Sequence, residues 1–167
     1  MAIGSNTQPK HIYFERERGV YDVDVTASVA YVSASVGDED GRSERIQALF
    51  DALGKAGIPV FLVKLHGVAV TFGVEESKVD DAERVLGEAG FPFKTRRDLA
   101  IVTVHAGTMR DLIGIMVRIA DALQLAQARM YGVGDSHSSV QCLIDGYRAE
   151  AAVRQLRAAF GLETQHE

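Results

Sequence analysis

The chain has 167 residues, a formal net charge of −5 at pH 7, and a composition of 47% hydrophobic and 25% charged residues. This length holds one ordinary domain or two small ones, and the composition is that of a globular protein. No apolar run approaches the roughly 20 residues that span a membrane, and the N-terminus lacks the apolar core of a signal peptide. The positive residues are dispersed, so we expect neither a membrane nor a nucleic acid as partner. A lone Cys142 cannot form an internal disulfide, which favours a reducing, cytoplasmic location.

The first half of the chain alternates between β-type and helical periodicity. Residues 1–25 form an N-terminal extension whose β-forming side chains allow it to add a strand. Ser43 is placed to cap the first helix after a turn rich in glycine and aspartate. The expected elements are a strand at 28–36, a helix at 43–56, strands at 58–65 and 68–74, a helix at 77–89, and an extended stretch from 91.

The second half repeats this order at an offset near 70 residues. The expected elements are a strand at 99–104, a helix at 112–123, strands at 128–133 and 138–145, and a helix at 147–160. We therefore expect an α+β fold of two ferredoxin-like βαββαβ units in tandem, at residues 26–97 and 98–167. One sheet face of each unit lacks helices, so pairing of two such units is expected.

Three segments resemble the regulatory region of aspartokinases. Residues 152–162 (AVRQLRAAFGL) match its closing helix, and residues 50–58 (FDALGKAGI) match a helix that runs into a strand. Gly107-Thr108-Met109-Arg110, followed by Gly114, is similar to a ligand loop of the family. The resemblance covers residues 24–162 and implies a tandem pair of ACT domains that senses a free amino acid of the lysine or threonine class.

The resemblance also implies partners and the absence of catalysis. ACT pairs usually bind their ligand as homodimers and control a biosynthetic enzyme, here a kinase catalytic subunit. In that family the kinase domain precedes the position of residue 20. We therefore expect no enzymatic activity, and three interpretations stay open: a separate regulatory subunit, a stand-alone sensor, or an excised regulatory fragment.

Several positions depart from the family pattern. The Pro-Gly pair of the first unit is Ser43-Glu44, and the proline of the second unit is Ile113, although Gly114 remains. A Thr-Ser-Glu segment of the family becomes Asp135-Ser136-His137. The loss of that glutamate weighs against lysine, because a ligand amine needs an acidic or carbonyl partner. An alternative function is therefore a dimerisation or protein-docking module whose ligand site is eroded.

The loop at residues 108–114 is the predicted ligand site. Backbone N–H groups at a helix N-terminus suit a carboxylate, and the helix dipole adds roughly 0.3–1 kcal/mol. Arg110 can form a bidentate pair with that carboxylate; the alternative is that it pairs with Asp111 or with a neighbouring glutamate across a dimer. The predicted ligand-binding residues are Asp38, Asp40, Thr108, Met109, Arg110, Asp111, Gly114, Ser136 and His137. For Asp38 and Asp40 the alternative is a solvated acidic turn, and for Ser136 it is an exposed loop serine.

The sequence offers only weak signals of an enzyme. The block Gly134-Asp135-Ser136-His137 resembles that of some esterases, but such chemistry needs a base held beside the serine by a third group. The five histidines have no short metal spacing, and Cys142 alternates with apolar neighbours as a core residue does. We therefore expect no catalytic residue, no metal and no cofactor.

Overall fold

The computed structural model describes residues 19–38, 40–109 and 111–162, and its elements follow the expected α+β order. The first half contains β1 (Val20–Ser35), α2 (Arg42–Lys55), β2 (Phe61–His66), β3 (Ala69–Glu75), a 3-10 turn (Glu76–Lys78) and α3 (Val79–Glu88). The second half contains β4 (Phe93–Ala106), α4 (Leu112–Leu125), β5 (Met130–Asp135), β6 (Ser139–Asp145), a 3-10 turn (Gly146–Arg148) and α5 (Ala149–Ala159). The ferredoxin-like tandem fold is thereby confirmed.

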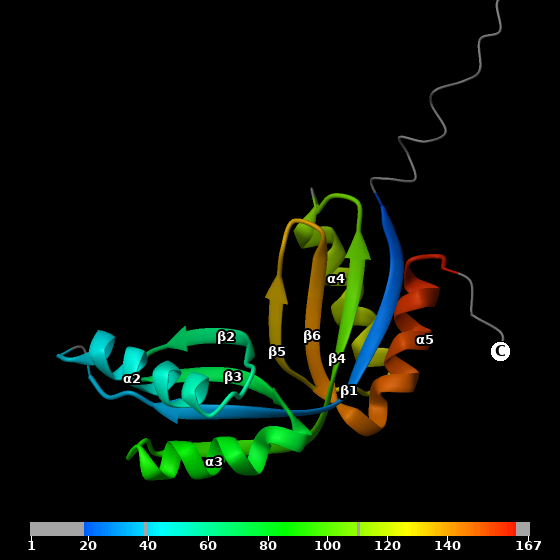
Figure 1. The fold of residues 1–167 in the computed structure, drawn as a ribbon. Coiled ribbons are helices and arrows are strands. Elements are labelled where there is room, and N and C mark those ends of the chain that lie inside the picture. Colours follow the sequence, from blue (N-terminus) through cyan, green and yellow to red (C-terminus); the bar gives the residue numbers. More distant parts are fainter. Residues whose placement is uncertain (1–18, 39, 110, 163–167) are drawn as a thin grey trace, which may run out of the picture.

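All six strands form one antiparallel sheet in the order β2-β3-β1-β4-β6-β5. Its two central strands are long, and each one serves both halves of the molecule (Figure 1). The N-terminal part of β1 pairs only with β4, as in Val25 opposite Val102, while its C-terminal part also pairs with β3, as in Ala30 opposite Val74. We call β2, β3, α2, α3 and the adjoining strand halves the first unit, and β5, β6, α4, α5 and the adjoining halves the second unit.

The boundaries expected at residues 25/26 and 97/98 therefore fall inside strands. Residues 20–25 are the first part of β1, and they lie in the second unit beside β4 and α5. In the first unit the strand after the second helix is β4. In the second unit the corresponding strand position, next to β4, is occupied by the N-terminal half of β1.

The repeat offset is 70 residues in most elements. Helices α2 and α4 begin at Arg42 and Leu112, and the 3-10 turns begin at Glu76 and Gly146. At the sheet centre Val29 lies opposite Leu99, its own repeat counterpart, so a local two-fold axis relates the units. Irregularities in β1 and β4 obey the same symmetry, because Ser28 and Asp98 both have φ of 59°.

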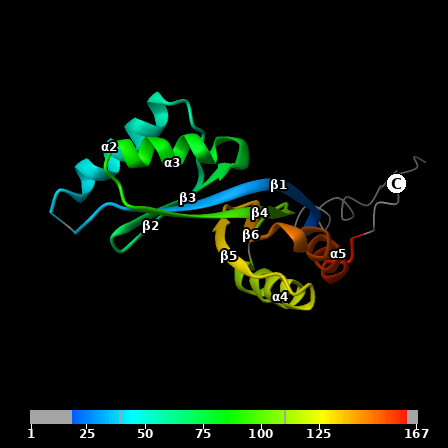
Figure 2. The same ribbon diagram turned by 90° about the horizontal axis from the view of Figure 1, so that it is seen from below.

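Two cores lie under the two helix pairs, on opposite sides of the sheet (Figure 2). The first core contains Leu49, Leu53 and Phe72, and the second contains Val102, Ile119 and Leu156, all almost fully buried. A third cluster occupies the corner where the sheet turns from one unit into the other. It consists of Val29, Leu99, Ile101 and Leu143, with Tyr31, Phe61, Leu62 and Tyr131 packed against them.

At this corner the two edge strands of the sheet, β2 and β5, come close to each other. The strands of the first unit run across the direction of those in the second unit, as Figure 1 shows. A β-carbon at Gly134 would lie 2.6 Å from Leu62 Cδ2, so a larger residue there would require the Leu62 side chain to shift. The two units are thus packed through apolar side chains on the sheet faces that carry no helices.

The expected cap of the first helix is wrong by two residues. The N-cap is Gly41, in a left-handed conformation with φ of 75°, and no side chain caps the helix. Ser43 lies inside the first turn because the helix already begins at Arg42. The acidic turn therefore leads into the helix through glycine rather than through a serine hydroxyl.

Candidate functional site

Two loops of the second unit meet at the predicted ligand site. The Met109 N–H donates to the His137 carbonyl oxygen at 2.7 Å, and the Ala106 N–H donates to the Ser138 carbonyl oxygen at 2.9 Å. The loop after β4 is therefore fastened to the β5–β6 turn by backbone bonds. The structure brings together the residue groups at 108–114 and 136–137, which are far apart in the sequence.

Asp111 begins helix α4. It is the N-cap residue, and its Oδ1 accepts a hydrogen bond from the Gly114 N–H at 3.0 Å. The side chain of Asp111 lies so close to Gly114 that a β-carbon there would collide with it. One of the free N–H groups expected to receive a ligand carboxylate is therefore already satisfied by a carboxylate of the protein.

A cleft of about 460 Å³ opens beside this helix start. Opposite charges lie in it, since Asp111 and Arg118 both contribute to its wall. The Arg118 guanidinium lies 5.9 Å from the centre of the Phe160 ring. The lining residues are Gly19, Val20, Thr108, Asp111, Gly114, Ile115, Arg118 and Phe160.

Arg118 was missed by the sequence interpretation. It lies four residues after Gly114, and this spacing places both residues on one face of a helix. Periodicity could have placed Arg118 next to the loop, but the short ring contact with Phe160 depends on packing between α4 and α5. Met109 is directed elsewhere, because it packs against the second core rather than lining the cleft.

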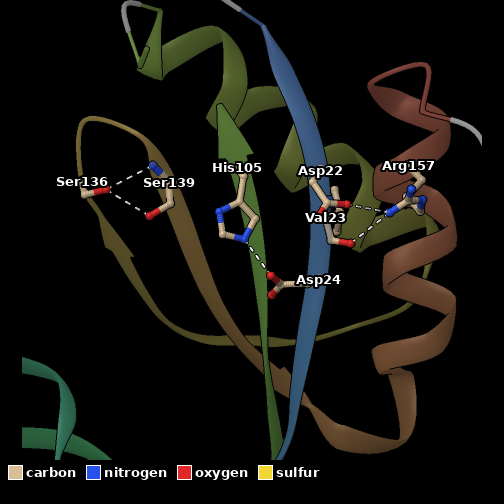
Figure 3. A network of polar contacts seen from close by, with 7 residues as sticks. All are labelled: Asp22, Val23, Asp24, His105, Ser136, Ser139 and Arg157. Atoms are coloured by element: carbon tan, nitrogen blue, oxygen red, sulfur yellow. Dashed lines mark hydrogen bonds and ion pairs between the residues drawn. The ribbon is translucent and has the colours of Figure 1, made fainter. Parts of the chain in front are cut away.

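Ser136 and His137 occupy the exposed β5–β6 turn. The Ser136 hydroxyl oxygen accepts bonds from the Ser138 and Ser139 N–H groups at 3.3 and 3.1 Å, and it lies 3.0 Å from the Ser139 hydroxyl (Figure 3). These are the bonds of a serine that stabilises a turn. The nearby His105 contacts Asp24 instead, at 2.7 Å, so this histidine is not the base that a nucleophilic serine would need (Figure 3).

The acidic turn of the first unit lies far from this cleft. Asp38 and Asp40 are exposed on the segment between β1 and α2, at the tip of the first unit (Figure 1). The loop before α4 lies at the end of the second unit, so one chain does not bring the two predicted groups together. Arg110 and Glu39 lie outside the described residues.

A polar network that the sequence interpretation did not include joins α5 to β1. Arg157 Nη1 donates to Asp22 Oδ1 and to the Val23 carbonyl oxygen, both at 3.1 Å (Figure 3). Asp24 accepts from the His105 ring across the β1–β4 pair. Arg157 thereby satisfies the Val23 carbonyl, and the two contacts together hold the N-terminal half of β1 against the second unit.

The lone thiol is a core group. Cys142 is buried on β6, and burial raises the pKa of its thiol to about 12. The thiolate, which is the reactive form, is therefore scarce at neutral pH. Within the described residues no group of three or more metal-ligating side chains occurs, and no helix there is long and apolar enough to cross a membrane.

Comparisons with known proteins give a consistent relationship. No protein-family model matches the chain. The chain is 27% identical over 132 residues to Aspartokinase 1 of Bacillus subtilis (strain 168), covering 78% of this chain and 31% of that protein. The regulatory subunit of aspartate kinase from Thermus thermophilus, in its ligand-free form, superimposes with a TM-score of 0.74 at 20% identity, over 86% of this chain and 99% of that chain. The chain has the tandem ACT fold of aspartokinase regulatory regions.

Other solved structures place this ACT pair in the same fold. A chain of the aspartokinase alpha and beta subunits superimposes with a TM-score of 0.76 at 22% identity, over 86% of this chain and all of that chain. The T-state of Escherichia coli aspartokinase III, in complex with lysine and aspartate, superimposes with a TM-score of 0.67 at 17% identity, over 86% of this chain and 33% of that chain. The fold that the resemblance of residues 152–162 and of the Gly107–Gly114 segment implied is thereby confirmed.

Proposed function

We propose that this ACT pair senses a free amino acid and transmits its binding to a biosynthetic enzyme of the aspartokinase type. The observation that carries the proposal is the cleft at the start of α4, where Asp111 and Arg118 present opposite charges across one small cavity. A free amino acid is a zwitterion, with an ammonium group for Asp111 and a carboxylate for Arg118. The apolar wall of Val20, Ile115 and Phe160 is suited to an aliphatic side chain.

The proposed assembly is a homodimer that docks on a kinase catalytic subunit. Solved aspartokinases include a regulatory subunit and an alpha and beta subunit pair, which supports this arrangement. Allostery would follow from differential affinity: the ligand stabilises one arrangement of the two units, and the kinase binds one arrangement better. In this proposal the ACT pair has no catalytic step of its own.

One observation favours a second function, that of a docking module. The Asp111 carboxylate occupies the Gly114 N–H that a ligand carboxylate was expected to bind. If the capping bond also prevents ligand entry, the ACT pair would retain only its role in dimerisation or in binding the kinase.

Thermal unfolding of the purified protein against each of the twenty amino acids at millimolar concentration separates these functions. A ligand at 100 times its dissociation constant stabilises the fold by about 2.7 kcal/mol, which raises the Tm by about 5–10 °C for a chain of this size. A selective shift with one or two amino acids, abolished in an Arg118→Ala variant, supports the sensor. The absence of a shift with all twenty contradicts the sensor and favours the docking module.

A further inference from the structure

A second cleft lies at the corner between the units, away from the start of α4. Its volume is about 460 Å³, and it opens beside the irregularity of β1 at Ser28. Phe61 supplies an aromatic ring, and Glu75 and Glu76 supply two carboxylates. The other lining residues are Thr26, Ala27, Ser28, Val29, Ser77, Ile101 and Gln141.

The internal two-fold symmetry supplies a filled counterpart of this cleft. Thr26, Phe61 and Glu75 correspond to Arg96, Tyr131 and Asp145 at the repeat offset. The strand register agrees, because Thr26 lies opposite Ile101 as Arg96 lies opposite Tyr31, and the second pair is the repeat image of the first. The two regions can therefore be compared position by position.

In the second unit a guanidinium occupies the counterpart position. The Arg96 guanidinium lies 4.5 Å from the centre of the Tyr131 ring, and the Tyr131 hydroxyl donates to Asp145 Oδ1 at 2.7 Å. A planar cation thus stacks on an aromatic ring whose edge is held by a carboxylate. This arrangement is complete within the protein chain and leaves no need for a ligand.

In the first unit the cation is absent but its surroundings remain. The short Thr26 side chain cannot cover the Phe61 ring as Arg96 covers Tyr131. Among the described residues no arginine, lysine or histidine forms an ion pair with Glu75 or Glu76, whereas a backbone N–H at Asp98 donates to Glu76 Oε1 at 3.4 Å. An aromatic face and a carboxylate without a cation line one cavity.

We propose that this corner cleft binds a small molecule with a guanidinium group, such as free arginine. The guanidinium stacks on the Phe61 ring and pairs with Glu75, in the place that Arg96 takes over Tyr131. Hydroxyl and amide groups of Ser28, Ser77 and Gln141 face the rest of the ligand and can donate to its carboxylate. A primary ammonium lacks the flat shape for stacking, so arginine binds better than lysine.

Such a ligand would contact both units. Phe61 and Glu75 belong to the first unit, while Ile101 and Gln141 belong to strands of the second unit. The bound molecule would therefore stabilise the observed corner between them. This site is distinct from the cleft at the start of α4, and the inference does not rest on the function proposed for that cleft.

Isothermal titration of the full chain with L-arginine tests the inference, with L-citrulline as the neutral isostere. We expect one arginine per chain and at least tenfold weaker binding of citrulline. Thr26→Arg places a guanidinium over Phe61, so this variant should lose arginine affinity at least tenfold.

Two controls keep the test decisive. Glu75→Gln keeps the shape of the cleft and should weaken arginine binding at least tenfold even if Thr26→Arg folds poorly, which circular dichroism would reveal. Arg118→Ala alters only the α4 cleft and should leave arginine binding unchanged, which separates this inference from the proposed sensor site. The inference is overturned if arginine does not bind, if citrulline binds equally well, or if the folded Thr26→Arg and Glu75→Gln variants bind arginine as the native chain does.

Discussion

Val29 pairs with Leu99 at the centre of the sheet, and each residue is the repeat counterpart of the other. Both side chains are almost fully buried in the corner cluster. This pairing sets the local two-fold axis between β1 and β4. Because the axis crosses two shared strands, neither unit has a complete sheet without residues from the other half of the chain.

The shared strands predict that the second unit depends on the start of β1. A variant that begins at residue 28 lacks the half-strand that pairs with β4, including the buried Val23. We expect it to lose protection from hydrogen exchange throughout α5 and the second half of β4, while a variant that begins at residue 19 keeps that protection. Equal protection in both variants would show that the half-strand is dispensable.

The hydrogen bonds from Arg157 on α5 to β1 are expected to stabilise the fold. Arg157→Met removes the hydrogen bonds to Asp22 and to the Val23 carbonyl from a side chain that is only 15% exposed, and we expect a loss of about 1–2 kcal/mol in the free energy of unfolding. Arg154→Met is the matched control on the same helix, because its exposed pair with Glu150 contributes less than about 0.5 kcal/mol. Urea unfolding measures both, and equal losses would contradict the assignment.

The close contact of Asp111 with Gly114 predicts strong coupling between the two positions. Asp111→Ala removes the N-cap bond and should cost about 1 kcal/mol. Gly114→Ala should also destabilise, although alanine is the better helix former, because its methyl group collides with the Asp111 carboxylate. In the double variant the collision is absent, so the two losses should not add; additive losses in a double-mutant cycle would refute the contact.

The buried thiol predicts a loss of stability at high pH. The pKa of Cys142 is raised from 9.0 to about 12, so folding favours the neutral thiol. Its contribution is complete below pH 9 and falls as the pH rises towards 12, by up to about 1.4 kcal/mol for each pH unit. The difference in unfolding free energy between the native chain and Cys142→Val should therefore shrink or reverse between pH 8 and pH 10.5. A difference that does not change with pH would contradict the burial of this thiol.

The repeat itself could be predicted from the sequence, because periodicity is a local property. Leu49 and Leu53, or Ile119 and Leu123, recur at helical spacing and lie in the two cores as expected. The sequence does not predict which half of β1 belongs to which unit. Residues 20–25 pair with β4 about 80 positions later, and nothing in their own pattern encodes that partner.

The candidate site was predicted only in part for the same reason. Thr108 and Gly114 were predicted from their resemblance to a family loop and Asp111 from its place beside them, and all three line the α4 cleft. The capping bond of Asp111 and the position of Arg118 beside Phe160 depend on side-chain geometry that a motif does not contain. The corner cleft could not be predicted from the sequence, because residues from both units line it and Thr26 and Phe61 belong to no motif.

The most direct test of the sensor is the thermal screen of the twenty amino acids repeated on Arg118→Ala. Arg118 is an exposed residue and forms no ion pair within the described part of the chain, so the ligand-free Tm should change little. We predict that an amino acid other than arginine, the ligand inferred for the corner cleft, raises the Tm of the native chain by several degrees and no longer does so for Arg118→Ala. An undiminished shift in that variant would show that the ligand binds elsewhere and would contradict the proposed site.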